Sequence, residues 1–323
     1  MRKNFDFVKN ANKFFIVAGA LLLIGVIVLC ISGVKLDINF TGGCIASYSY
    51  TGEIDLDEAK AVIEGKTEYP VKVSKNDSLT SGESILSVSI TAKNGLTNEN
   101  QSEINKALEE KYKDNGLKLH ESNNVSATVG GKFFAKSIFA VVLAAAFIVI
   151  YVAIRFRNIG GASAAISALV ALVHDVLIAF FSCVVLGINV DSNFIAVVLT
   201  LFGYSLNNTI VIYDRVRENK RKYPDHTTAE LVNESINGTL MRSLITTATT
   251  LFAVVAIAVI SELRGVHSLR SLVIPMAVGL IAGFYSSVCI AGPLWVKWKN
   301  RSEKNKKSKN SYTSYRKPKK SGR

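Results

Sequence analysis

The stretch LFGYSLNNTIVIYDRVREN, residues 201–219, begins like a membrane span and ends in a burst of charge. Two adjacent amides, Asn207 and Asn208, lie between its apolar start and the charged residues Asp214 and Arg215. Polar side chains are costly inside a bilayer, so they usually face another helix or a water path. The stretch therefore predicts a membrane helix with one face that does not contact lipid.

The composition predicts a protein that crosses the membrane several times. Apolar residues make up 49% of the 323 residues, and the mean hydropathy is +0.28, too apolar for an average soluble protein. A span takes roughly 20 apolar residues and must be helical to satisfy its backbone. The first run is longer than a signal-peptide core and lacks a cleavage site, so we expect a retained anchor. The six candidate spans are 14–34, 137–154, 161–186, 194–213, 243–260 and 271–294.

Lys and Arg residues predict the orientation, because they collect in short cytoplasmic segments. Four precede the first span, six lie in 214–242 and twelve follow the last span, whereas the loop 187–193 has none. We therefore expect both termini in the cytoplasm of a prokaryote, at its plasma membrane. The expected organisation is a cytoplasmic N-terminus (1–13), the first span (14–34), an extracytoplasmic α+β domain (35–134), five further spans (135–295) with a cytoplasmic loop at about 214–242, and a basic cytoplasmic tail (296–323).

The polar segment between the first two spans has the pattern of a small domain. We predict strands at 44–50, 71–74, 84–91 and near 125–129, and helices at 55–64 and 97–112. The order βαββαβ is typical of a ferredoxin-like fold. The predicted fold class is thus a polytopic α-helical membrane protein with six transmembrane helices and one small α+β (ferredoxin-like) extracytoplasmic domain between helices 1 and 2. The sequence shows no nucleophile–base pair, nucleotide loop or metal cluster, so we expect no enzyme, cofactor or metal site.

Asp175 is the strongest candidate for a functional residue inside the membrane. A carboxylate near mid-bilayer either binds a cation or takes up a proton, and both would make it a switch. His174 beside it is then its hydrogen-bond partner. Asn207 and Asn208 fit interhelical hydrogen bonding as well as a functional role. Arg242 fits two roles. It can help to fix the orientation, because a long side chain can reach the membrane interface, or it can take part in the mechanism. Thr246 follows it in the fifth span and is a further candidate.

Small residues at helical spacing predict close packing of the spans. Gly203 lies on one face with Ala196, Thr200 and Asn207. In the last span Gly279 and Gly283 are four residues apart, with Ser287 and Ala291 continuing the same face.

The net charge of +13 lies almost entirely in the tail, where residues 297–323 hold twelve Lys or Arg against Glu303. This distribution argues against a specific nucleic-acid partner. A basic tail after a span fits anionic lipid, a cytosolic partner such as the ribosome, or a role in orientation alone. The four cysteines do not suggest a disulfide framework.

Several segments together resemble the SecF family, in order and with its spacing, from about residue 37 to 294. They are Asp37 with Gly42 and Gly43, ALVHDVLIAFF, LFGYSLNNTIVIYDRVREN, SINGTLMRSLITTATTLFAV and VGLIAGFYSSVCIAGPL. The resemblance implies a half-transporter of the resistance-nodulation-division superfamily. It also implies SecD as an obligate partner, a place beside the Sec translocation channel, and ion-driven movement and release of preproteins.

One position departs from the family pattern. SecF commonly has G-Y-S-x-N-D-T in the fourth span, whereas this chain has GYSLNNT, with Asn208 at the aspartate position. The family assigns ion coupling to that aspartate and to an arginine that is present here as Arg242. Since an amide cannot take up a proton, three readings stay open. SecD supplies the carboxylate, Asp175 takes part, or the coupling ion is sodium, for which an amide oxygen can be a ligand.

Two other functions compete with this one. A small-molecule or lipid exporter of the same superfamily would need a larger outer domain than about 100 residues and a second six-span repeat. A scaffold of the channel that transports nothing would tolerate substitutions of its intramembrane polar residues.

Overall fold

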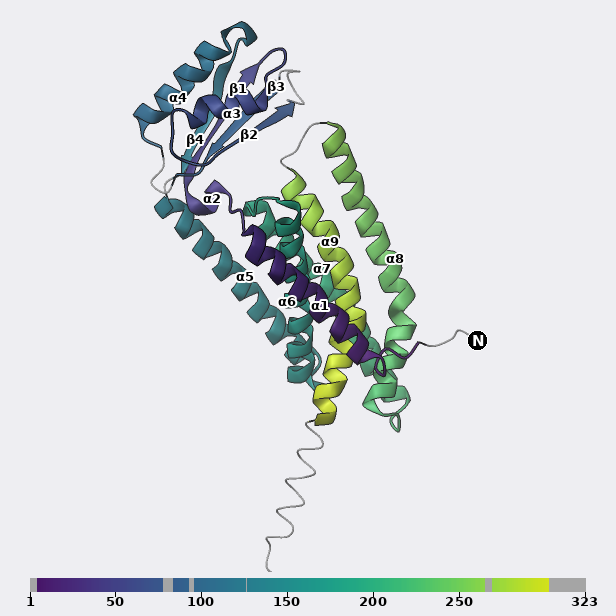
Figure 1. The fold of residues 1–323 in the computed structure, drawn as a ribbon. Coiled ribbons are helices and arrows are strands. Elements are labelled where there is room, and N and C mark those ends of the chain that lie inside the picture. Colours follow the sequence, from purple (N-terminus) through teal and green to yellow (C-terminus); the bar gives the residue numbers. More distant parts are fainter. Residues whose placement is uncertain (1–4, 78–83, 93–95, 126, 265–268, 302–323) are drawn as a thin grey trace, which may run out of the picture.

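The computed structural model describes residues 5–77, 84–92, 96–125, 127–264 and 269–301. These residues form a helical bundle with a small sheet domain at one end and the N-terminus near the other (Figure 1). Most of the predicted basic tail, residues 302–323, lies outside the described residues. The predicted fold class is confirmed, because the described residues include six helices long and apolar enough to cross a membrane, with one four-stranded sheet between the first two of them.

Each predicted span overlaps one long helix, and α6 begins and ends at the predicted residues. Both ends of α6 are marked by glycines with positive φ, Gly160 and Gly187. After α9, a π-helical turn, Ser287–Ala291, continues the same helix toward Arg301. The six helices are α1 (Ala11–Ser32), α5 (Ala127–Arg155), α6 (Gly161–Leu186), α7 (Ser192–Lys222), α8 (Thr228–Leu263) and α9 (Arg270–Ser286).

The segment 214–242, which we expected to be a loop, is helical except for the turn at 223–227. α7 continues into its charged end, where Arg217 pairs with Asp214 three residues earlier at 2.9 Å. α8 begins with a capping box in which Thr227 and Glu230 satisfy each other's backbone N–H groups. The helices thus extend beyond the apolar runs because local capping and side-chain pairs stabilise the polar turns.

The sheet domain has the predicted order βαββαβ. Its strands are antiparallel in the order β2-β3-β1-β4, as in ferredoxin-like folds. α3 and α4 cover one face (Figure 1), where Tyr48, Leu86 and Leu108 are fully buried. The elements are β1 (Gly43–Tyr50), α3 (Leu56–Glu64), β2 (Val71–Asp77), β3 (Ser84–Ile90), α4 (Asn98–Lys111) and β4 (Lys118–Val125).

The predicted last strand, 125–129, was wrong. β4 ends at Val125, and α5 already begins at Ala127. β4 is an edge strand of mostly polar residues, so it lacks the apolar alternation that marks a half-buried strand. Its pairing with β1 and the buried Leu117 before it fix the strand instead.

A short neck joins the sheet domain to the bundle. The one-turn helix α2 (Ile38–Thr41) places Phe40 against Phe133 and Phe134 of α5, with ring centroids 5.8 and 5.3 Å apart. A Cβ at Gly130 would lie 3.0 Å from the Gly42 nitrogen. The segment that enters the sheet domain at Gly42 and the helix that leaves it at Gly130 are therefore in contact. The backbone N–H of Asp37 also donates to the carbonyl of Val190, before α7, at 3.0 Å.

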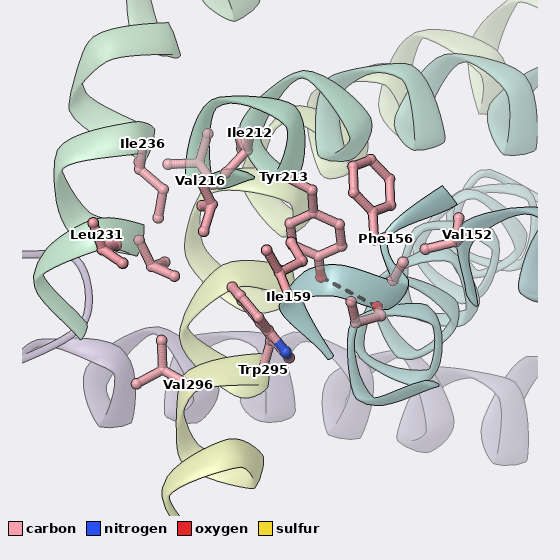
Figure 2. Packing of buried hydrophobic residues seen from close by; sticks show 14 of the residues in the cluster. Val152, Phe156, Ile159, Ile212, Tyr213, Val216, Leu231, Ile236, Trp295 and Val296 are labelled. Atoms are coloured by element: carbon pink, nitrogen blue, oxygen red, sulfur yellow. Dashed lines mark hydrogen bonds between the residues drawn. The ribbon is translucent and has the colours of Figure 1, made fainter. Parts of the chain in front are cut away.

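Aromatic packing fixes the opposite end of the bundle. Figure 2 shows Phe156, just after α5, Tyr213 of α7 and Trp295 of the last helix converging in one buried cluster. Tyr213 lies 5.6 Å from each of the other two rings and donates its hydroxyl to the Ala164 carbonyl at 3.3 Å. By contrast, α8 lies at the edge of the bundle (Figure 1), and Phe252 on it is 75% exposed.

Candidate intramembrane polar site

Asp175 is fully buried on α6 and joins three helices. Its Oδ2 accepts hydrogen bonds from the hydroxyl of Ser205 on α7, at 2.6 Å, and from that of Ser286 on α9, at 2.8 Å. Its Oδ1 lies 3.1 Å from Nδ1 of His174. Both carboxylate oxygens therefore have partners, which is the condition for keeping a carboxyl group inside a protein at acceptable cost.

Glycines allow α7 and α9 to approach closely at this site. A Cβ at Gly283 would lie 3.1 Å from the Ser205 Cβ and 3.6 Å from Oδ2 of Asp175. One turn away, a Cβ at Gly279 would lie only 2.4 Å from Cδ1 of Leu201. Two of the three glycines that we expected to mediate packing thus lie at the contact between α7 and α9.

Gly203, the third of these glycines, does not pack inside this chain. Its α-carbon faces outward, and no described atom lies within 4 Å of an added Cβ. Ala196, Thr200 and Asn207, predicted to share its face, are exposed too. α7 presents its other side, with Leu201, to α9, so the small-residue face is exposed.

A second set of hydroxyls extends the network along the contact between α7 and α9. Ser287 donates to the Ser205 carbonyl at 3.1 Å, and Thr209 donates to the Ser287 hydroxyl, also at 3.1 Å. Ser287 lies in the π-helical turn, a feature that is frequent at functional sites. Sequence reasoning did not include Ser205 or Ser286 among the candidate site residues. The signals for them were the position of Ser205 beside the two amides of the fourth span and the two adjacent serines, 286 and 287, in an apolar run.

The two adjacent amides have different environments. Asn208 is 3% exposed, and its Nδ2 has no hydrogen-bond partner among the described residues. Asn207 is exposed and, with Arg242, lines a cleft of about 1070 Å³ between α7 and α8. Thr246 donates its hydroxyl to the carbonyl of Arg242 at 2.8 Å, a bond within α8. No hydrogen bond between the described residues joins Arg242 or Thr246 to Asp175.

Four buried polar atoms near the middle of the bundle lack partners among the described residues. They are His174 Nε2, Tyr204 Oη, Asn208 Nδ2 and Ser243 Oγ. An unpaired buried polar group costs roughly 1–3 kcal/mol, and internal water commonly satisfies such groups. A carboxyl group, an imidazole and several hydroxyls in one network are groups that can pass a proton or coordinate a small cation.

Comparison with known proteins gives a consistent match. The family model for "Protein export membrane protein SecD/SecF, C-terminal" matches residues 104–301. A protein translocase subunit SecF of Alicyclobacillus acidocaldarius is 34% identical over 315 residues, covering 94% of this chain and 96% of the relative. A SecF subunit of Acidaminococcus fermentans is 33% identical, covering 93% of this chain and 99% of the relative.

Longer relatives match this chain over one part of their length. A protein translocase subunit SecDF of Bacillus subtilis is 31% identical over 94% of this chain, which spans 39% of that relative. The crystal structure of SecDF, a translocon-associated membrane protein from a Thermus species, matches with a TM-score of 0.75 and 27% identity. That match covers 93% of this chain and 39% of the other. By sequence along nearly its whole length and by fold, this chain belongs to the SecD/SecF family of protein export membrane proteins.

Proposed function

We propose that this chain works as a SecF subunit beside a Sec translocation channel. With SecD, it drives the late translocation and release of preproteins by using an ion gradient across the membrane. The observation that carries this proposal is the end-to-end match with SecF subunits, in which 94% of this chain aligns with 96% of the relative. The fused SecDF relatives, of which this chain spans 39%, support SecD as the partner.

The charges support one orientation in the cytoplasmic membrane. α5 ends at Arg155, and its C-terminal end and the charged end of α7 lie at the end of the bundle opposite the sheet domain (Figure 1). Lys and Arg favour the cytoplasmic side of a membrane. Both termini are then cytoplasmic, and the sheet domain lies outside, where its neck connects it to α5 and to the start of α7.

Asp175 is the ionisable group through which the bundle responds to the ion. Its carboxyl can take up a proton, and its Oδ1 lies 3.1 Å from Nδ1 of His174. The protonation state then changes the strength of the bonds from Ser205 and Ser286, since a hydroxyl binds an ionised acceptor more strongly. A proton or cation at this site would thereby alter how tightly α6, α7 and α9 are held together.

The outward face of α7, with Ala196, Thr200 and Gly203, is where SecD packs in this proposal. Small residues allow the backbones of membrane helices to approach closely, and this face is exposed in the chain alone. Asn207 lies at its edge. The side of the ion path that does not take up a proton is then formed by Asn208, Arg242 and Thr246. SecD adds a carboxylate of its own.

The experiment is complementation of cells depleted of SecF, with preprotein release as the readout. The chain is expressed with its own SecD, as wild type, as Asp175→Asn, and as the matched control Asp225→Asn, an exposed carboxylate in the turn between α7 and α8. Membrane levels are measured alongside. We expect wild type and the control to restore release, and Asp175→Asn to fail at normal protein levels.

Two other outcomes would change the proposal. If the wild-type pair does not restore release although both subunits accumulate, the SecF function is wrong. If Asp175→Asn restores release fully, titration at Asp175 is not needed and the coupling carboxylate lies on SecD. If the chain were a scaffold that transports nothing, variants of the other intramembrane polar residues would restore release fully as well.

A further inference from the structure

We propose that residues 5–10 form a strap that holds the first turns of α8 in place, and that Asn233 and Asn237 are the positioning residues that dock it. The strap directly precedes α1 and contacts α8 at the end of the bundle opposite the sheet domain (Figure 1). Its docking is a property of the chain itself. Only the last step of the proposal, that preprotein release depends on the docked strap, rests on the proposed export function.

Two asparagines about one helical turn apart bind the backbone of the strap. Asn237 Oδ1 accepts from the Phe5 N–H at 3.1 Å, and its Nδ2 donates to the Phe5 carbonyl at 2.8 Å. Asn233 Oδ1 accepts from the Phe7 N–H at 2.8 Å. The spacings match, because an extended segment advances roughly 6.6 Å in two residues and a helix roughly 6 Å in four. The strap therefore runs antiparallel to α8, with one amide side chain for every second residue.

The strap also buries an aromatic side chain. Phe7 is 7% exposed and belongs to the same apolar cluster as Ile236 and Trp295. Its ring centroid lies 6.2 Å from that of Phe14 on α1. Chain termini are usually poorly ordered unless specific contacts tie them down. Here a buried ring and three hydrogen bonds to side chains of α8 supply such contacts.

The first turns of α8 are held from other sides by α7 and by the last helix. Asn219 of α7 donates to the Ser235 hydroxyl at 3.0 Å. On the last helix, a Cβ at Gly292 would lie 3.2 Å from Cδ1 of Ile236. Asn233 and Asn237 lie on a further face of α8, four residues apart. The strap thus completes the grip on this end of the helix.

The rest of α8 depends on that grip. Among its residues after Thr247, only Val254 and Ser261 are buried. A continuous helix keeps its direction over several turns, because each turn is hydrogen-bonded to the next. The contacts at its first turns therefore set where the outer part of α8 lies.

A row of rings connects the strap with the buried polar site. Phe14, which packs on Phe7, accepts at its carbonyl a hydrogen bond from the Tyr285 hydroxyl at 2.7 Å. The Tyr285 ring lies 6.1 Å from that of His174, the neighbour of Asp175. Loss of the strap would loosen both α8 and this row beside the ionisable carboxyl group. Release should therefore depend on the docked strap.

A simpler account is that the strap only adds stability, and the two asparagines separate the accounts. Asn233 gives the strap an acceptor, a role that an aspartate can take over. Asn237 gives both an acceptor and a donor, and a carboxylate has no N–H for the Phe5 carbonyl. Asn233→Asp should keep the strap docked and Asn237→Asp should release it, although both changes add the same charge.

The test is hydrogen–deuterium exchange of the purified full-length chain in detergent, read by mass spectrometry at the peptides that contain the Phe5 and Phe7 amides. The variants are Asn233→Asp, Asn237→Asp and the double change Asn233→Ala/Asn237→Ala. The matched control is Asn158→Ala, at an exposed asparagine just after α5. Each protein is also measured for thermal unfolding and, in the complementation assay with SecD, for release per unit of accumulated protein.

We expect the amides of the strap to exchange at least about tenfold faster in the double variant and in Asn237→Asp, the factor that the loss of one hydrogen bond implies. Release per unit of protein should fall in the same two variants. Asn233→Asp and the control should behave like wild type, because they leave the bonds to the strap in place.

Three results would overturn parts of the proposal. Unchanged exchange in the double variant would mean that the asparagines do not dock the strap. Equal exchange in Asn233→Asp and Asn237→Asp would contradict the assigned donor and acceptor. Full release per unit of protein from a variant with fast exchange would leave the strap with a role in stability alone. If wild type itself does not restore release, the export function is wrong, whereas exchange still decides whether the strap docks.

Discussion

Replacing Ser205 by alanine tests whether Asp175 is held as a carboxylate by its neighbours. The substitution removes the hydroxyl that donates to Oδ2 at 2.6 Å and leaves the Ser205 carbonyl, with its bond from Ser287, in place. A separation of roughly 2.5–2.7 Å is typical of a hydroxyl that binds an ionised carboxylate. Such bonds contribute about 1.5–3 kcal/mol, against about 0.5–1.5 kcal/mol between neutral groups. We therefore expect Ser205→Ala to lower the free energy of unfolding by about 2 kcal/mol.

The assay is equilibrium unfolding of the purified chain in mixed micelles, with a double-mutant cycle. In an Asp175→Asn background the acceptor is neutral, and the loss on Ser205→Ala should fall to about 1 kcal/mol. Ser182→Ala is the matched control, because Ser182 donates to the Ala179 carbonyl of its own helix, at 2.6 Å, and not to a carboxylate. It should change stability by less than about 0.5 kcal/mol. Equal losses for Ser205→Ala in both backgrounds would refute the reasoning that Ser205 binds an ionised carboxylate.

Two further predictions concern the helix contacts and the start of α7. Gly279→Leu should destabilise the chain by about 1–3 kcal/mol through overpacking, because an added Cβ would lie 2.4 Å from Leu201. Gly203→Leu should leave stability unchanged and weaken co-purification with SecD, because an added Cβ there meets no described atom within 4 Å. An equal loss of stability in the two variants would contradict this packing. Burial raises the pKa of Asp191, which caps α7 and accepts from Ser271, above its ordinary 3.8. The folded state then binds that proton more tightly, so the contribution of Asp191 to stability falls as pH rises from 3.8 through the raised pKa. Unfolding measured across this range should show a flatter pH dependence for Asp191→Asn than for wild type, and an unchanged slope would contradict the assignment.

The sequence predicts the membrane helices well where residues that end helices coincide with the limits of the apolar run. α6 is such a case, because glycines stand directly before and after it. The charged ends of α7 and α8 are different. Hydropathy drops after Tyr213, but a helix depends on hydrogen bonding and capping, and the capping box at Thr227 extends α8 well into the polar segment. Polarity alone therefore does not separate a loop from a helix outside the membrane.

The site was only partly predictable for a related reason. A carboxylate in an apolar run is rare enough to single out Asp175. A serine in a membrane helix is common and often bonds the carbonyl four residues earlier, as Ser167 does to Ser163 at 2.9 Å. Only the three-dimensional packing reveals that the hydroxyls of Ser205 and Ser286 donate to the carboxylate of Asp175 instead. Adjacent residues on a helix point in different directions, so Asn207 and Asn208 had to differ, but which of them would be buried depends on how α7 is rotated.

α7 is the element that connects the sheet domain with the buried network. Its cap, Asp191, follows Val190, which exchanges backbone hydrogen bonds with the neck at Lys35 and Asp37. Its middle holds Asp175 through Ser205, and its far end lines the cleft between α7 and α8. Packed interiors are too dense for one part of a helix to shift without its contacts adjusting. A pull on the sheet domain and a change of charge at Asp175 therefore act on the same helix, which is the arrangement that a subunit coupling an ion gradient to movement outside the membrane requires.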